Sequence, residues 1–129
     1  PYDYILGIGD NAIRKNVAEL ILSKKKKLLN VINGSANISQ NTIIGQGNFI
    51  AKNAVINVLT KIGDYCIQYF QENGIGTGVR VGEQSFIGAN SVIKENITIG
   101  RNVVIGAGSV VIKDVPDYSK IVGNPGRVI

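Results

Sequence analysis

The chain has 129 residues, enough for one domain of ordinary size, and carries a formal net charge of +5. This modest excess suits an anionic small molecule, whereas the few aromatic residues do not interleave with the basic ones, which argues against a nucleic-acid partner. The sequence contains no His, so the commonest general base and the commonest metal ligand are both excluded.

A single cysteine, Cys66, excludes a disulfide framework and indicates a reducing compartment. The sequence shows no signal peptide and no apolar run long enough to span a membrane. We therefore expect a cytoplasmic protein without a membrane partner.

Residues 1–30 differ in pattern from the rest of the chain. The stretch YDYILGIG, residues 2–9, alternates in a way that predicts a short strand. A helix is predicted to follow, capped by Asp10 or Asn11. Its apolar face holds Ile13, Val17, Leu20 and Ile21. Lysines 24–27 follow the helix end, where the helix dipole favours positive charge, and KLLNVI, residues 27–32, predicts a strand.

From residue 31 an aliphatic side chain falls at every sixth position. These are Ile38, Ile44, Ile50, Ile56 and Ile62 and, after a break, Ile75, Val81, Ile87, Ile93, Ile99, Ile105 and Val111. Small or β-branched residues stand four places later, namely Thr42, Ala54, Thr60, Cys66, Val79, Ser85, Ser91, Ile97, Val103 and Ser109. A hexapeptide period is typical of a parallel β-helix, in which three short strands make one triangular coil of about 18 residues.

The same spacing excludes a helical interpretation, because a period of six does not stay on one face of an α-helix. In a β-helix each hexad sends its aliphatic residue inward and its small residue into a corner, and the coils stack about 4.8 Å apart. We therefore predict an all-β fold with about four coils. Residues 1–30 would cap one end, and the tail from Asp114, where Pro116 and Pro125 break the period, would cap the other.

Three segments resemble one family of enzymes. Residues 81–116, VGEQSFIGANSVIKENITIGRNVVIGAGSVVIKDVP, and the ending VGNPGRVI look like the C-terminal half of bacterial hexapeptide-repeat acetyltransferases. Residues 2–17, YDYILGIGDNAIRKNV, resemble the end of the small Rossmann-like domain in one branch. That branch comprises the sialic-acid O-acetyltransferases and the N-acetyltransferases of nucleotide-linked 4-amino sugars.

This resemblance covers nearly the whole chain and implies a left-handed parallel β-helix. Residues 1–30 would be a β-α remnant of a Rossmann-like nucleotide-sugar-binding domain. Residues 31–129 would be the acyltransferase domain with its C-terminal capping tail. The resemblance further implies a homotrimer that takes acetyl-CoA as acyl donor in the groove between neighbouring β-helices.

By this resemblance, the backbone around Gly88, Ala89, Gly106 and Ala107 lines the pantetheine arm of acetyl-CoA. Small residues suit that role because they let a ligand approach the main chain closely, although the same residues also fit ordinary corner positions. Thr77, with the adjacent glycine, falls near the position of the family's oxyanion donor.

Other residues would contact the ends of the two substrates. Lys113, Lys120 and Arg127 could meet the phosphates of the cofactor, although isolated surface charges need no ligand to explain them. Gly9 aligns with the glycine that contacts the nucleotide-linked sugar. Asp10 follows it, and amides at the helix N-terminus there could help to hold an anion.

Two features depart from the family pattern. The upstream half of the Rossmann-like domain, with its Gly-rich turn, is absent. Relatives also carry a His in an acidic E-H-D/E-C segment, which deprotonates the acceptor. Here IQYFQENGIGTG, residues 67–78, takes that place, and roughly one coil of about 18 residues is missing. Ile62 and Ile75 are two hexads plus one residue apart, so we expect the β-helix to continue through a one-residue slip or an outward loop.

Acetyl transfer from a thioester needs a nucleophile, a base and donors for the developing oxyanion. Asp64 and Glu72 are the carboxylates near the altered segment, but a carboxylate with an ordinary pKa is a poor base at neutral pH. Both also fit solvated turns. Cys66 occupies a corner position and fits packing better than nucleophilic attack.

The aromatic side chains within residues 67–78 and just before them could form a wall of the site, although a loop patch or a subunit contact explains them more simply. They are Tyr65, Tyr69 and Phe70.

An amine acceptor changes this balance. A sugar amine is partly neutral near pH 7 and already nucleophilic, so binding and orientation alone can give some rate. A hydroxyl acceptor needs a base, so the sequence favours N-acetylation over O-acetylation.

Three hypotheses therefore stay open: an acetyl-CoA-dependent acetyltransferase of a sugar or nucleotide-linked amino sugar, a catalytically inactive trimeric β-helix that acts as a binding or scaffold protein, and a truncated enzyme. A γ-type carbonic anhydrase shares the fold but needs His ligands for zinc and is excluded.

Overall fold

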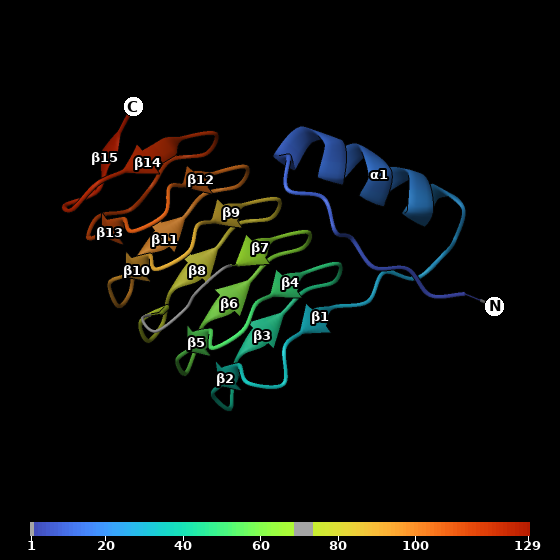
Figure 1. Cartoon of the computed structure of the whole chain (residues 1–129), viewed down its shortest axis with the longest axis horizontal. Coiled ribbons are helices and arrows are strands. Elements are labelled where there is room, and N and C mark those ends of the chain that lie inside the picture. Colours follow the sequence, from blue (N-terminus) through green and yellow to red (C-terminus); the bar gives the residue numbers. More distant parts are fainter. Residues whose placement is uncertain (1, 69–73) are drawn as a thin grey trace.

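The computed structural model describes residues 2–68 and 74–129, and their main feature is a parallel β-helix (Figure 1). Three ladders of short parallel strands form the three faces of the β-helix. Face 1 contains β1 (Val31–Ile32), β4 (Phe49–Ile50), β7 (Ile67–Gln68), β9 (Phe86–Ile87) and β12 (Val104–Ile105). Face 2 contains β2 (Asn37–Ile38), β5 (Val55–Ile56), β10 (Val92–Ile93) and β13 (Val110–Val111). Face 3 contains β3 (Ile43–Ile44), β6 (Lys61–Ile62), β8 (Arg80–Val81) and β11 (Thr98–Ile99).

The strand order confirms the predicted left-handed β-helix of hexapeptide repeats, but it corrects the number of coils. In the described part of the chain five coils begin, at β1, β4, β7, β9 and β12, where the hexad count predicted about four. The difference arises because Ile32 of β1 and Gln68 of β7 occupy hexad positions that the count left out. Beyond the fifth coil, β14 (Lys120–Val122) still stacks parallel on β12. Only β15 (Arg127–Val128), which pairs antiparallel with β14, ends the stack.

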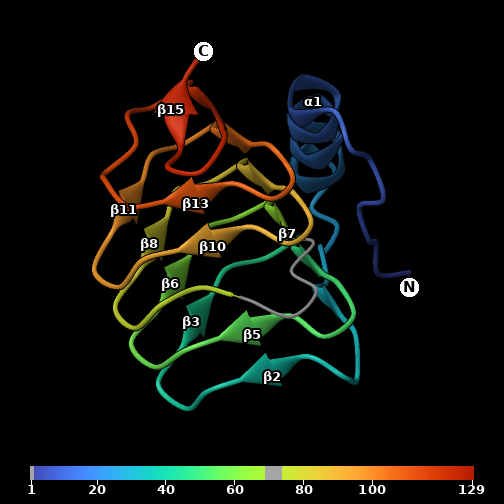
Figure 2. The same ribbon diagram turned by 60° about the vertical axis from the view of Figure 1, so that its left-hand side comes forward.

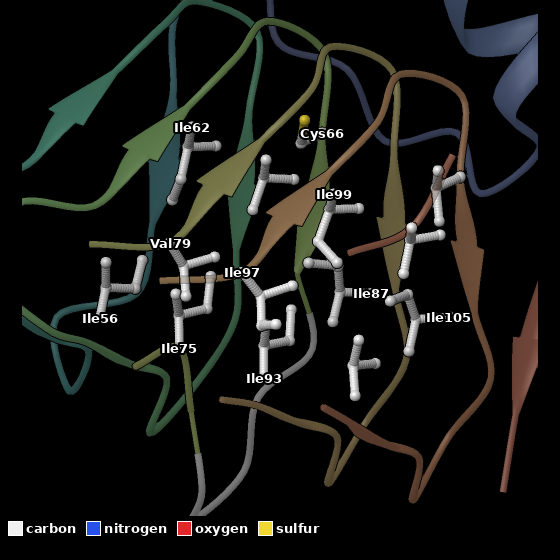
Figure 3. Packing of buried hydrophobic residues seen from close by; sticks show 14 of the residues in the cluster. Ile56, Ile62, Cys66, Ile75, Val79, Ile87, Ile93, Ile97, Ile99 and Ile105 are labelled. Carbon is white, nitrogen blue, oxygen red and sulfur yellow. The ribbon is translucent and has the colours of Figure 1, made fainter. Parts of the chain in front are cut away.

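Isoleucines and valines of the hexads form the core, as the period predicted. The inward rows run along the β-helix axis, and Figure 3 shows Ile56, Ile75 and Ile93 in one such row. All three side chains are at most 1 % exposed. The corner residues Ser85 and Val103 are also fully buried, so both halves of the hexad prediction are confirmed.

The break in the hexad pattern is a change of register by one residue. Ile50 pairs with Gln68, 18 residues later, whereas Ile56 pairs with Ile75, 19 residues later. The extra residue therefore lies between Gln68 and Ile75, and from Ile75 to Ile93 the spacing is 18 again. The predicted one-residue slip is confirmed. Tyr69, Phe70 and Glu72, together with the question of an outward loop, lie outside the described residues.

The helix α1 (Asn11–Ser23) lies alongside face 1 (Figure 2). The prediction that residues 1–30 cap one end of the β-helix is therefore wrong, because β1, β2 and β3 are each the last strand of their sheets. Asp10 is the N-cap of α1, and its carboxylate accepts a hydrogen bond of 2.9 Å from the Ile13 amide. The predicted helix is thus confirmed. Two residues of its predicted apolar face, Val17 and Ile21, pack with the buried cluster around Ala18, but the other two do not. The buried residues are Arg14 and Ala18, whereas Ile13 and Leu20 are both more than half exposed.

The predicted strand over residues 2–9 is not formed. The only strand-like contact of this segment within the described residues is an isolated bridge between Tyr4 and Leu28. Leu6 and Leu28 are buried with Ala18 in a small second cluster between α1 and the β-helix, and Tyr65 packs against it. The predicted strand over residues 27–32 is shortened to β1.

Candidate functional site

A pocket of about 450 Å³ lies between the N-terminus of α1 and the upper part of face 1. Its walls come from the residues before and at the helix start and from strands β9, β12 and β14. The lining residues are Gly9, Asp10, Asn11, Ala12, Phe86, Asn102, Val104, Tyr118 and Lys120. The pocket therefore joins the N-terminal segment to the tail of the β-helix.

Arg14 holds the helix beside this pocket. Its guanidinium is fully buried and donates hydrogen bonds to the backbone carbonyls of Tyr65 at 2.7 Å and Gln84 at 3.2 Å, both in corners of the β-helix. It also donates to the carbonyls of Ile8 and Gly9 in the segment before the helix. One side chain thus fixes the pocket wall around Gly9 to two coils of the β-helix.

Two amide side chains complete this attachment. Asn11 donates from Nδ2 to Oδ1 of Asn102, at 3.2 Å, just before β12. Gln84 donates from Nε2 to the carbonyl of Asn11, also at 3.2 Å. These two bonds could not be predicted from the sequence, because their partners are far apart along the chain.

The pocket contains one cation and one carboxylate. Asp10 caps the helix, so the protein's own carboxylate already occupies the N-terminus where an anion was expected to bind. Lys120 of β14 is the cationic side chain in the lining. Gly9, Asp10 and Lys120 are thus brought together, although Lys120 was expected to meet the cofactor.

The predicted cofactor residues form a separate ridge on the β-helix. Gly88 and Ala89 follow β9, and Gly106 and Ala107 lie one coil further on, in the turns that join face 1 to face 2. Ala107 is exposed, and a Cβ placed on the neighbouring Gly108 would meet nothing within 4 Å. The ridge is therefore open at Ala107 and Gly108, whereas Gly88 is buried against the Ala107 backbone of the next coil.

The amides of the ridge differ from those of another corner. Between faces 3 and 1, the Gln46 and Arg101 amides donate to the carboxylates of Asp64 and Asp117 one coil further on. Within the described residues, the amides of Ala89 and Ala107 find no acceptor. These donors are consequently available to a ligand carbonyl.

Thr77 lies apart from this ridge, in the turn from face 2 to face 3. Of the two candidate oxyanion donors there, the Gly78 amide is occupied, because it donates to the Val58 carbonyl at 3.0 Å. The Thr77 amide has no acceptor among the described residues. Thr77 and Ala89 flank opposite edges of face 2 in one chain.

The remaining candidates for chemistry have structural roles. Burial raises the pKa of the Cys66 thiol to about 12, and its Sγ lies 3.2 Å from the Gly82 carbonyl, so it is a packed corner residue rather than a nucleophile. Asp64 is half-buried and accepts from the Gln46 amide. Lys113 and Arg127 are exposed and lie outside the pocket lining.

Two kinds of site are absent from residues 2–68 and 74–129. Within them no set of three His, Cys, Asp or Glu side chains could hold a metal ion. The same part of the chain contains no helix with the length and apolar character needed to cross a bilayer.

Comparison with known proteins identifies the repeat. Residues 75–113 match the model of the bacterial transferase hexapeptide (six repeats). A serine acetyltransferase from Synechococcus elongatus is 38% identical over 95 residues, which are 67% of this chain but only 39% of that protein. This chain thus spans well under half the length of that relative.

Two solved structures share almost the whole fold. A mutant perosamine N-acetyltransferase from Caulobacter crescentus, in complex with CoA and GDP-perosamine, is 26% identical with a TM-score of 0.80 and covers 97% of this chain and 68% of its own. The acetyltransferase domain of PglB from Neisseria gonorrhoeae, in complex with acetyl coenzyme A, is 27% identical with a TM-score of 0.81 and covers 98% and 70%. The repeat and the fold agree: residues 75–113 carry the hexapeptide repeat, and nearly the whole chain shares the fold of both acetyltransferase structures.

Proposed function

We propose that this chain is an acetyl-CoA-dependent N-acetyltransferase whose acceptor is a nucleotide-linked amino sugar. The observation that carries the proposal is the pocket between α1 and face 1. Its lining combines the Lys120 cation and the Asp10 carboxylate with the small residues Gly9 and Ala12. Both solved structures named above are of acetyltransferases in complex with CoA or acetyl-CoA, and one also contains a nucleotide-linked amino sugar.

The pocket suits an acceptor of this kind. Lys120 would pair with a diphosphate as a point charge. Asn102 and the Asp10 carboxylate would bond to sugar hydroxyls or to the amine, and the Tyr118 ring offers an apolar surface. Because the helix N-terminus is already capped, recognition of the phosphates depends on Lys120 more than on helix amides.

The ridge suits the acyl donor, acetyl-CoA, which supplies the acetyl group as a thioester. The free amides of Ala89 and Ala107 would donate to carbonyls of its pantetheine arm. Thr77, at the other edge of face 2, would reach such a donor only from a neighbouring copy of the chain. The proposal therefore includes a site shared between neighbouring β-helices in a homotrimer.

The absence of His fits an amine acceptor. A neutral amine attacks the thioester carbonyl without a protein base: an N–C bond forms, the C–S bond breaks, CoA leaves as its thiolate, and the proton lost by the nitrogen passes through solvent to the sulfur. The chain would contribute by binding and orienting the two substrates and by the Thr77 amide facing the oxyanion.

Calorimetric titration with acetyl-CoA is the first test, followed by thiol release with GDP-perosamine and with serine as acceptors. We expect binding of acetyl-CoA, turnover with the amino sugar and none with serine. The K120A variant should weaken binding of the nucleotide sugar about tenfold, because the charge-assisted hydrogen bond from this exposed lysine to the phosphates is lost, while K113A, a lysine outside the pocket, should leave it unchanged. Failure to bind acetyl-CoA would refute the proposal.

The second candidate function is a binding or scaffold protein without catalysis. It is favoured by the same lack of His and by the structural roles of Cys66 and Asp64. Binding of both substrates without thiol release would support it. Truncation of an enzyme, the third hypothesis, would be supported if an upstream coding segment restored turnover.

A further inference from the structure

The two ends of the β-helix are built differently. At the C-terminal end the tail covers all three faces: β15 pairs with β14, Gly126 donates to the Val110 carbonyl at 2.8 Å, and Val115 forms a bridge to Ile99. At the other end β1, β2 and β3 each stand last in their sheets. Figure 2 shows no chain beyond the coil that contains β2 and β3. We call this coil, residues 31–45, the open end.

The open end presents backbone hydrogen-bonding groups as well as apolar side chains. Val31 and Asn33 donate to carbonyls of the next coil, so the backbone of Ile32 between them faces the other way, toward the end. The same alternation places the backbones of Ile38 and Ile44 at the end. Ile32 is 42% exposed and its two counterparts are half-buried, whereas inward residues of later coils are almost completely covered.

The composition of the open end is also unusual. Residues 28–51 contain no Asp, Glu, Lys or Arg, although such residues make up 18% of the chain. Natural edge strands are commonly protected from pairing by charges, by Pro or by a covering segment. The open end has none of these protections among its described residues.

We propose that the open end binds the open end of a second copy of this chain. Each chain carries a net charge of +5, so two copies repel one another except where their surfaces are free of charge. Stacking of an open end on a capped end is prevented because the tail already fills the edges there. Pairing of like ends is therefore closed and two-fold symmetric, and it stops at two copies.

The geometry of this contact follows from the symmetry. A two-fold axis between two facing triangular coils makes their strands antiparallel across the contact. The free backbone groups of Ile32, Ile38 and Ile44 can then pair with those of the other copy, and their side chains would close the two ends of the core. This surface is distinct from the sides of the β-helix, where the proposed acetyl-CoA groove lies.

Sedimentation velocity over a range of protein concentrations tests this inference. The wild-type chain should form a species with twice the mass of the particle formed by the I38K variant, because a charge at the end blocks strand pairing. The matched control is I129K, which makes the same change at the capped end, where Ile129 is 69% exposed. It should keep the wild-type mass.

Hydrogen exchange of the wild-type chain gives a readout that does not depend on a variant folding. The Ile32, Ile38 and Ile44 amides should become protected as concentration rises, while the amide of Asn90, in an exposed turn far from the open end, should not change. Equal masses for wild type and folded I38K, or exchange at these three amides that is independent of concentration, would overturn the proposal. A trimer built only along the sides would give that second result and leave the proposed function intact.

Discussion

Replacement of Gln68 by Ile should stabilise the protein. Gln68 lies at an inward hexad position of face 1, between Ile50 and Ile87 in the adjacent coils, and all three side chains are fully buried. Among the described residues, neither the Nε2 nor the Oε1 atom of Gln68 has a hydrogen-bond partner. A polar group buried in this way costs about 1–3 kcal/mol in folding free energy.

Isoleucine has a similar volume, prefers strands and restores an uninterrupted isoleucine row on face 1. We expect the Q68I variant to gain about 2–4 kcal/mol, the removed penalty plus the burial of an apolar side chain. For a domain of this size that corresponds to a rise in Tm of very roughly 6–15 °C. Chemical denaturation followed by circular dichroism measures the gain directly.

The matched control is Gln40→Ile, because Gln40 is exposed in a turn of the first coil. That change should alter stability by less than about 0.5 kcal/mol. If Q68I is no more stable than the wild type, the amide has partners that satisfy it, and the interpretation of this position as an interrupted core row is wrong.

Three further changes test other parts of the fold. Arg14→Ala should release α1, at a cost of about 3 kcal/mol or more, and hydrogen exchange should show the loss in the helix before the β-helix. Burial holds the pKa of Cys66 at about 12, so the unfolded thiol ionises first and stability should fall by about 1.4 kcal/mol per pH unit between about pH 9 and 12, a slope absent from C66A. Gly82→Ala would place a Cβ 2.5 Å from the Gly100 carbonyl carbon and should destabilise strongly, whereas Gly34→Ala meets nothing within 4 Å and should be close to neutral in thermal melts.

The β-helix could be predicted from the sequence because its signal is local. A side chain every sixth residue decides which groups point inward, and no distant partner is needed to read it. The same arithmetic predicted the slip between Gln68 and Ile75. The coil count failed at Ile32 and Gln68, because the first precedes the clear repeat and the second is polar where an aliphatic residue was sought. The stacking of β14 on β12 was also missed, since it comes only 16 residues later and carries no hexad pattern.

The environment of α1 could not be predicted in this way. Nothing in the sequence distinguishes Arg14 from a surface residue, yet its guanidinium donates to carbonyls 51 and 70 residues along the chain. A sequence does not indicate which backbone carbonyls will accept such bonds, because every residue has one. Arg14 and Ala18 are consequently the buried residues of α1, and Ile13 and Leu20 are exposed. The place of Lys120 in the pocket could not be predicted either, because it lines the pocket together with residues 9–12, which are distant in the sequence.

The lack of His makes the pH dependence of transfer the most direct test of how the proposed enzyme works. If the acceptor amine alone supplies the nucleophile, kcat/KM should rise tenfold per pH unit below the pKa of the free amine and level off above it. The break should coincide with the value found by titrating the acceptor without protein. It should stay there in a D64N variant, because that carboxylate is bound to the Gln46 amide. A break that departs from the pKa of the amine, or that moves in D64N, would identify a protein base and contradict catalysis by binding and orientation alone.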